Sequence, residues 1–333
     1  METSKKIEKV KKSFEKRGKT SYKVAKREIL KEKIEYAPIY DALKYFIEEF
    51  WHNFHHPALL SLTCEAVKGK TENTTLIGAS LVLLTGAADI HDDIIDKSTT
   101  KESKSTVFGK FGLEAALLVG DALLLKGFKL LHDACNDFTK EQKNIIIEWV
   151  KDAFFDLGTA VAKEASFKGR WDLTPEEYLD VMTMKAAVAE VTARIGAFIG
   201  GGSQKEIEAL GQYGRMLGIL ATIRDDFIDI FEPNELENRV KNECLPLPIL
   251  YVLRDKKMKD KVVNMLKRDK LTEKDTLMIA KNIRESQAFR AFNEKLEHFL
   301  ENGHKQLQVI KNQKIARKLS EILDSMTEDI AHF

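Results

Sequence analysis

Two stretches of this chain decide its fold, LVLLTGAADIHDDIID at residues 81–96 and LGILATIRDDFID at residues 217–229. Each is an apolar run that leads into three aspartates, and the spacing of the three is the same in both runs. Apolar residues without strand-like alternation predict helices here, and residues four apart share one helix face. The sequence therefore predicts two apolar helices that carry matching acid triplets: Asp92, Asp93 and Asp96 on the first, and Asp225, Asp226 and Asp229 on the second.

Helical spacing also extends outward from these runs through most of the 333 residues, while alternating strand-like runs are scarce. No Ser-, Gly- or Pro-rich linker divides the chain. We therefore expect an all-α fold with a single large helical bundle over residues 36–333, preceded by a basic, mobile segment over residues 1–35. The predicted helices lie near residues 22–50, 56–69, 74–98, 111–134, 140–168, 175–200, 204–231, 246–254, 257–267, 272–284 and 287–328.

The overall charge argues against a nucleic-acid partner. The net charge is +1, although residues 5–33 are rich in Lys and Arg. We interpret that excess as a solvated helix face, with peripheral contact to anionic lipid as the alternative. The three cysteines, Cys64, Cys135 and Cys244, are far apart and lack metal-type spacing. With no apolar leader segment, these features lead us to expect a cytoplasmic protein.

The acid triplets point to a metal site. Carboxylates clustered on an apolar helix repel one another, and their burial is costly without a counter-charge. Mg²⁺ prefers oxygen ligands, keeps several waters and bridges carboxylates to phosphate oxygens. Two such helices facing each other would hold a diphosphate through metal ions. A solvated acidic patch and a water-filled structural cavity remain the alternatives.

Basic residues near the triplets are candidates for binding phosphate. Lys185 lies in the apolar stretch 182–188, where an unpaired ammonium would be costly. A lysine that reaches the surface along its own stem is the alternative. Arg224 directly precedes the second triplet, and Arg239 and Lys241 follow it. Each of these three could equally form an ordinary ion pair.

At these residues the chain resembles the trans-prenyl diphosphate synthases, or polyprenyl synthetase family, which are marked by two DDxxD motifs on facing helices of an all-α bundle. The likeness runs from about residue 38 to about residue 254. It rests on the two acid triplets and on the motifs at residues 91–96, 108–109, 120–124, 185–187, 224–229 and 245–248.

The resemblance implies an isoprenoid synthase bundle with a central active-site cavity, a homodimer and an allylic prenyl diphosphate as substrate. By the same resemblance the six aspartates would bind three Mg²⁺ ions. The diphosphate would be held by Lys101, Lys185, Arg224 and Arg239. Ala87 and Ala88 match the positions that limit chain length, and their small side chains favour substrates of about C15–C25.

The chain departs from the family where a second diphosphate, isopentenyl diphosphate, would bind. Residues 51–57 read WHNFHHP in place of Gly-Gly-Lys-x-x-Arg-Pro, so Asn53 replaces the lysine and His56 the arginine. Thr85 replaces a histidine, and Glu102 stands where an arginine would meet phosphate. Since each charge-assisted hydrogen bond is worth roughly 1.5–3 kcal/mol, we expect this pocket to be degraded. Partial positive charge from the histidines at 52, 55 and 56 is the remaining source of attraction.

Three functions are consistent with this pattern. The sequence favours an enzyme of one substrate, similar to terpene synthases, that ionises an allylic diphosphate and converts the cation itself. The alternative is a prenyltransferase that elongates the chain with isopentenyl diphosphate or passes the prenyl group to another acceptor. The third is a regulatory subunit, which would have little use for two complete acid triplets because their repulsion costs stability.

Overall fold

The computed structural model describes residues 5–101 and 103–331, and these residues confirm the all-α fold. The described strands are β1 (Thr100–Lys101) and β2 (Lys104–Ser105), which form one antiparallel pair. The first half of the chain forms α1 (Lys5–Leu30), α2 (Ala37–Tyr45), α3 (His55–Ala66), α4 (Thr75–Ile95), α5 (Val107–Phe111), α6 (Leu113–Ala134) and α7 (Lys140–Ala165). A π-helical turn, η1 (Phe46–Phe50), continues α2, and a 3₁₀ turn, η2 (Thr71–Thr74), leads into α4.

The second half is also helical. It forms α8 (Pro175–Lys185), α9 (Ala187–Ile199), α10 (Gln204–Asp229), α11 (Pro233–Asn242), α12 (Leu247–Val252), α13 (Lys259–Leu266), α14 (Glu273–Glu285), α15 (Ala288–Leu307), α16 (Gln313–Ser325) and α17 (Glu328–Ala331).

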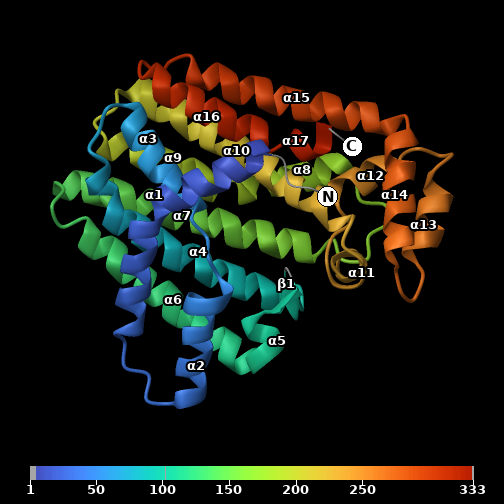
Figure 1. Cartoon of the computed structure of the whole chain (residues 1–333), viewed down its shortest axis with the longest axis horizontal. Coiled ribbons are helices and arrows are strands. Elements are labelled where there is room, and N and C mark those ends of the chain that lie inside the picture. Colours follow the sequence, from blue (N-terminus) through green and yellow to red (C-terminus); the bar gives the residue numbers. More distant parts are fainter. Residues whose placement is uncertain (1–4, 102, 332–333) are drawn as a thin grey trace.

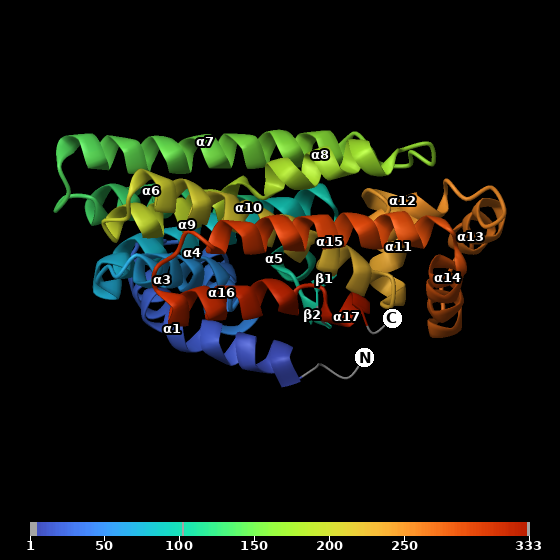
Figure 2. The ribbon, with the colours of Figure 1, turned by 90° about the horizontal axis from the view of Figure 1, so that it is seen from above.

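The two helices with acid triplets lie inside the bundle (Figure 1). Helix α4 packs against α6, α1 and α3, and α10 packs against α9 and α15. Figure 2 shows α7 and α8 along one side of the molecule, with α1 and α16 on the opposite side. Helices α13 and α14 lie together at one end. The triplet helices are thus surrounded by other helices.

Helix α4 is the more apolar of the two triplet helices inside the bundle. By length and composition the span Thr71–Ile95 could cross a membrane, but 67% of its most apolar window is buried within the bundle. Leu81, Leu83 and Leu84 are fully buried. The burial matches the apolar run quoted at the outset, and it identifies α4 as a core helix.

The first predicted helix was wrong at its start and in its continuity, whereas its predicted end at residue 50 matches the end of η1. The predicted span 22–50 instead begins at Lys5 and breaks after Leu30. Ile7, Val10 and Phe14 extend the apolar stripe and are buried, while lysines cover the opposite face. Helix α1 packs on α3, α4 and α16, so residues 5–30 form a packed helix where we expected a mobile basic segment.

Other predicted helices divide where the apolar spacing continues. The span 175–200 breaks at Ala186, whose ψ of −8° ends α8 before α9 begins. The span 287–328 divides into α15 and α16, followed by the short α17. Helix α11 was not predicted. The predicted start at residue 175 is confirmed, because the Thr174 side chain accepts from the Glu177 backbone N–H and forms a capping box.

Candidate active site

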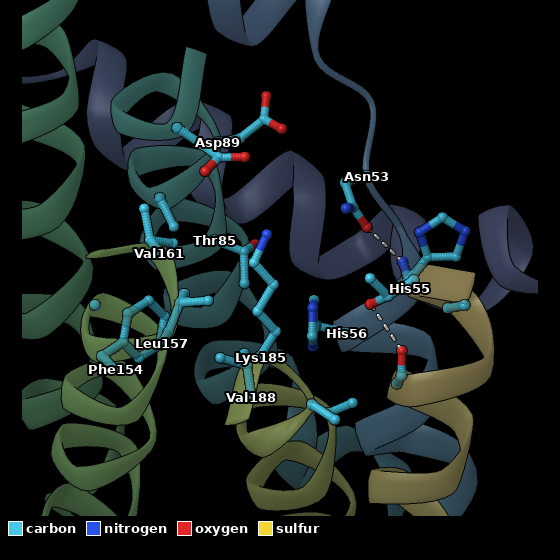
Figure 3. Close-up of a pocket in the computed structure, with 18 of the residues that line it drawn as sticks. Asn53, His55, His56, Thr85, Asp89, Phe154, Leu157, Val161, Lys185 and Val188 are labelled. Carbon is cyan, nitrogen blue, oxygen red and sulfur yellow. Dashed lines mark hydrogen bonds between the residues drawn. The ribbon is translucent and has the colours of Figure 1, made fainter. Parts of the chain in front are cut away.

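A cavity of about 1450 Å³ opens among α3, α4, α6, α7, α9 and α10. Asp92 from α4 and Asp225 from α10 both line it, and Lys185 lines it at the end of α8. Figure 3 looks into this cavity, with Lys185 and Val188 on one wall and Phe154, Leu157 and Val161 on another. The bundle therefore has the expected central cavity, and one aspartate of each predicted triplet lines it.

Both triplets occupy the C-terminal ends of their helices. Asp96 is the C-cap of α4, and Asp229 is the last residue of α10. The last turn of a helix carries partial negative charge from its free carbonyls, which disfavours carboxylates. Two groups of like charge are thus held where the backbone also repels them.

Desolvation by the surrounding protein raises the pKa of every one of these aspartates, although only Asp93 and Asp226 are fully buried and Asp225 is exposed. It raises the pKa of Asp93 to about 7 and that of Asp96 to about 8 on the first helix. On the second helix it raises the pKa of Asp225 to about 6 and that of Asp229 to about 7. Burial also raises the pKa of Asp92 and Asp226. The carboxylates are costly to ionise here until a cation joins them.

The donor set fits metal ions that are shared with a diphosphate. Within residues 5–101 and 103–331, no group of three or more His, Cys, Asp or Glu side chains is arranged to hold a metal ion. However, Oδ1 of Asp92 is buried without a hydrogen-bond partner. Mg²⁺ is commonly bound by one or two carboxylates plus waters and substrate phosphate oxygens. Carboxylates on two facing helices meet that requirement.

Lys185 lies in a buried ion pair. Its ammonium contacts Glu164 of α7, a carboxylate that is only 7% exposed. The hydroxyl of Tyr178 lies 3.0 Å from the Glu164 carboxylate and 3.2 Å from Oδ1 of Asp226. The nearby Glu164 and Asp92 charges raise the pKa of Lys185 despite its burial, so Lys185 carries a positive charge into the cavity.

Arg239 belongs to the second triplet. From α11 its guanidinium binds Asp226, lies 3.8 Å from Asp229 and donates to Tyr178 at 3.0 Å. The backbone N–H of Leu247 donates to the other Asp226 oxygen at 2.8 Å. Asp226 is therefore held from three sides.

The other two predicted phosphate ligands also have carboxylate partners. Lys101 lies 2.7 Å from Asp93 and 3.2 Å from Asp89, and Arg224 donates from Nε to Asp329 of α17 at 3.0 Å. Lys185 and Arg224 line the cavity, whereas Lys101 and Arg239 contact the aspartates without being part of its wall. Lys241 instead pairs with Glu237 on the exposed side of α11.

Comparison with known proteins settles the family. The sequence model of the polyprenyl synthetase family matches residues 45–284. The chain belongs to the polyprenyl synthetase family. The resemblance inferred from the two acid triplets is thereby confirmed.

Relatives that match this chain are named as isoprenyl and geranylgeranyl diphosphate synthases. The chain is 32% identical over 181 residues to the short chain isoprenyl diphosphate synthase of Methanothermobacter thermautotrophicus, covering 54% of each chain. The chain matches a little over half the length of such curated relatives.

Geranylgeranyl pyrophosphate synthetase from Pyrococcus horikoshii has the same fold, with a TM-score of 0.84, 21% identity and coverage of 97% and 99% of the two chains. A polyprenyl synthase from Caulobacter crescentus, complexed with calcium and isoprenyl diphosphate, gives a TM-score of 0.75 at 18% identity, with coverage of 95% and 96%.

The two alanines predicted to limit chain length in this polyprenyl synthetase differ in position. Ala88 lines the cavity, one turn before Asp92. Ala87 is fully buried in a core cluster that includes Phe46, and it is not part of the cavity wall. A larger side chain at position 88 would therefore enter the cavity directly, whereas one at position 87 would not.

The predicted second pocket opens on the same cavity, through Asn53, His56 and Thr85. Glu102 lies outside the described residues. The surrounding protein lowers the pKa of both His55 and His56 to about 4, although His55 is exposed and His56 is only partly buried. The lowered pKa values argue against a positive charge on these two rings. His52 instead stacks on Tyr22, outside the cavity wall.

Sequence reasoning missed two carboxylates of the site. Asp89 lies three residues before Asp92, lines the cavity and pairs with Lys101. Its spacing places it on the same helix face as the triplet, so the pattern could have revealed it. Glu164 had no comparable signal, because only the fold brings α7 against Lys185.

Proposed function

We propose that this polyprenyl synthetase is a Mg²⁺-dependent enzyme that removes diphosphate from an allylic prenyl diphosphate of about C15–C25. One observation carries this proposal. Asp92 of the first triplet, Asp225 of the second and the cationic Lys185 line a single cavity, and the pKa values of both aspartates are raised. We also propose that three ions bind with the diphosphate.

Each part of the site has a defined task in this reaction. Diphosphate leaves poorly alone, and bound Mg²⁺ would neutralise the charge that develops on its oxygens. Lys185 would turn from Glu164 to a phosphate oxygen, and Arg224 would do the same from Asp329. Leu157 and Phe154 would pack against the prenyl tail, and this apolar wall would shelter the cation from water.

The fate of the cation has two candidates. Chain elongation with isopentenyl diphosphate is supported by the relatives, which are named as isoprenyl and geranylgeranyl diphosphate synthases. We place it first, ahead of the one-substrate reaction that the sequence favoured. The uncharged His56 and Asn53 support the second candidate, a reaction of one substrate, because a second diphosphate would meet no cation at these two positions.

One experiment separates the two candidates. The purified protein is incubated with Mg²⁺ and farnesyl, geranylgeranyl or geranylfarnesyl diphosphate, each with and without isopentenyl diphosphate, and products are identified by mass spectrometry. Longer diphosphates formed only with isopentenyl diphosphate would support elongation. Hydrocarbon or alcohol formed without it would support the one-substrate reaction. No release of diphosphate in any mixture would refute the proposed function.

We further propose that the protein is a homodimer. Leu117, Leu118 and Leu125 of α6 and Phe155 of α7 are exposed apolar side chains on neighbouring helices, and the last is 73% exposed. Sedimentation equilibrium would test this, and a change of Leu125 and Phe155 to glutamate should give monomers. A wild-type protein that sediments as a monomer would refute the proposal.

A further inference from the structure

The outer face of α1 carries a straight stripe of positive charge. Seven exposed basic residues repeat at intervals of three or four positions, which places them on one side of the helix. They are Lys5, Lys9, Lys12, Lys16, Lys19, Lys23 and Arg27. At a rise of about 1.5 Å per residue, this basic stripe is about 33 Å long. The opposite side of α1 is buried against α3, α4 and α16.

Ion pairs leave much of this charge uncompensated. Four of the seven residues each pair with one acid: Lys9, Lys12, Lys19 and Arg27. Each of these four side chains is more than half exposed, so solvent screens the pairs. Three have no ion pair among the residues that the structure describes: Lys5, Lys16 and Lys23. Like charges at this spacing repel each other and destabilise a helix, so the stability of α1 does not explain the stripe.

Helix α16 widens the basic surface beside α1. Its Glu321 contacts Lys9 at 3.0 Å, which brings the exposed sides of the two helices together. Arg317 and Lys314 are exposed and lie one and two turns before Glu321, on the same side of α16. Figure 2 shows α1 and α16 on the side of the molecule away from α7. The proposed dimer surface on α6 and α7 would therefore leave this basic surface uncovered.

The side chains of the stripe favour an anionic membrane over a protein partner. Within Lys5–Leu30 the exposed residues are Lys, Arg and Glu together with Thr20, and none is apolar or aromatic. Protein interfaces are usually centred on aromatic or apolar residues, which this face of α1 does not offer. A bilayer with anionic lipid attracts basic residues by charge alone. A helix with such a polar outer face would lie against the headgroups without inserting.

The location of the stripe connects a membrane to the cavity. Phe14, on the buried side of α1, lines the cavity. The exposed His55 also lines it, and its ring lies 5.3 Å from the Phe14 ring between centroids. The cavity is therefore open to solvent beside α1. The apolar tail of a prenyl diphosphate partitions into a bilayer and leaves the diphosphate at the surface, so a membrane on α1 would present the substrate beside the cavity. This step alone rests on the proposed function.

We propose that the basic surface of α1 and α16 binds the anionic surface of a phospholipid membrane. The contact is peripheral and electrostatic, so it should weaken as salt screens the charges. The phosphates of duplex nucleic acid would also match a linear basic stripe. The opening of the cavity beside α1 favours the membrane, and the test separates the two partners.

Sedimentation with lipid vesicles tests the proposal. At low salt the full chain should sediment with vesicles of phosphatidylcholine and phosphatidylserine, and it should stay in solution with vesicles of phosphatidylcholine alone. Each basic residue near an anionic bilayer strengthens binding about fivefold. A variant that combines Lys5→Gln, Lys16→Gln and Lys23→Gln should therefore bind on the order of 100-fold more weakly.

The matched control removes the same charge from α7, α10 and α14. It combines Lys140→Gln, Lys205→Gln and Lys274→Gln, at exposed lysines that have no ion pair within the described residues. The control should bind the vesicles as the wild type does. Circular dichroism of both variants should match that of the wild type, because all six changes are on exposed helix positions.

Three results would overturn the proposal. The first is a wild-type protein that stays in solution with phosphatidylserine vesicles at low salt, and the second is equal binding by the stripe variant and its control. The third is release of the protein from the vesicles by duplex DNA at equal phosphate concentration, which would indicate a nucleic-acid surface. Vesicle binding needs no turnover, so the proposed function and this inference can fail separately.

Discussion

Asp93→Asn should stabilise the metal-free protein while removing its activity. Asp93 is 1% exposed, and burial raises its pKa from 3.8 to about 7. Because the folded-state pKa is raised, the unfolded chain releases its proton first as the pH increases. The stability of the wild type therefore falls between about pH 4 and pH 7 and this contribution stays constant above that range.

The size of the effect follows from these pKa values. A difference of about three pKa units corresponds to about 4 kcal/mol, which asparagine would recover at about pH 8 because it stays neutral. At about pH 5.5 the recovery should be about 2 kcal/mol, since the titration is only partly complete there. Lys101 keeps Asp89 as a partner at 3.2 Å, so the change leaves no unpaired lysine.

Urea denaturation in EDTA at both pH values measures this difference. Asp156→Asn is the control, because Asp156 is an exposed acid on α7. If Asp93 binds metal as proposed, the same variant should release diphosphate at a small fraction of the wild-type rate. A stability gain that is absent, or equal at the two pH values, would contradict the idea that the triplet is strained without metal.

Three further changes test other parts of the site. Asp92→Ala or Asp225→Ala should abolish diphosphate release while circular dichroism shows a preserved fold, and near-normal turnover in either would refute the metal-cluster assignment. Ala88→Phe should shift preference toward shorter allylic substrates. The same change at the fully buried Ala87 should mainly lower the melting temperature. An unchanged chain-length profile for Ala88→Phe would refute the role of Ala88 in limiting substrate length. Glu164→Gln should lower the pKa of Lys185 and so weaken the binding of inorganic diphosphate above about pH 9, which calorimetry measures. Equal affinity across pH would show that the ion pair does not control the charge of Lys185.

The triplet helices could be predicted because their apolar runs and aspartates lie close together in the sequence. The start of α1 was missed because lysines outnumber the apolar residues of its buried face, which a short window interprets as a polar tail. The break at Ala186 leaves no trace in composition. Its position immediately after Lys185 is visible only in the backbone angles.

The partners of the cations could not be predicted in the same way. Lys185 was recognised as a costly buried charge, yet its partner Glu164 is 21 residues away on another helix. Arg224 and Asp329 are 105 residues apart. Such pairs depend on how α7, α8, α10 and α17 pack, and local spacing carries no information about that packing.

The hydroxyl of Tyr178 would couple cation binding to phosphate binding in the proposed site. It lies within hydrogen-bond distance of both Glu164 and Asp226, but it has one hydrogen to share between them. A cation that binds Asp226 would displace that hydrogen toward Glu164, and Glu164 would then hold Lys185 less strongly. By thermodynamic reciprocity, a phosphate group that draws Lys185 away would strengthen cation binding at Asp226 by the same factor. The two ligands would therefore prepare the site for each other, and the empty site would keep its charges paired.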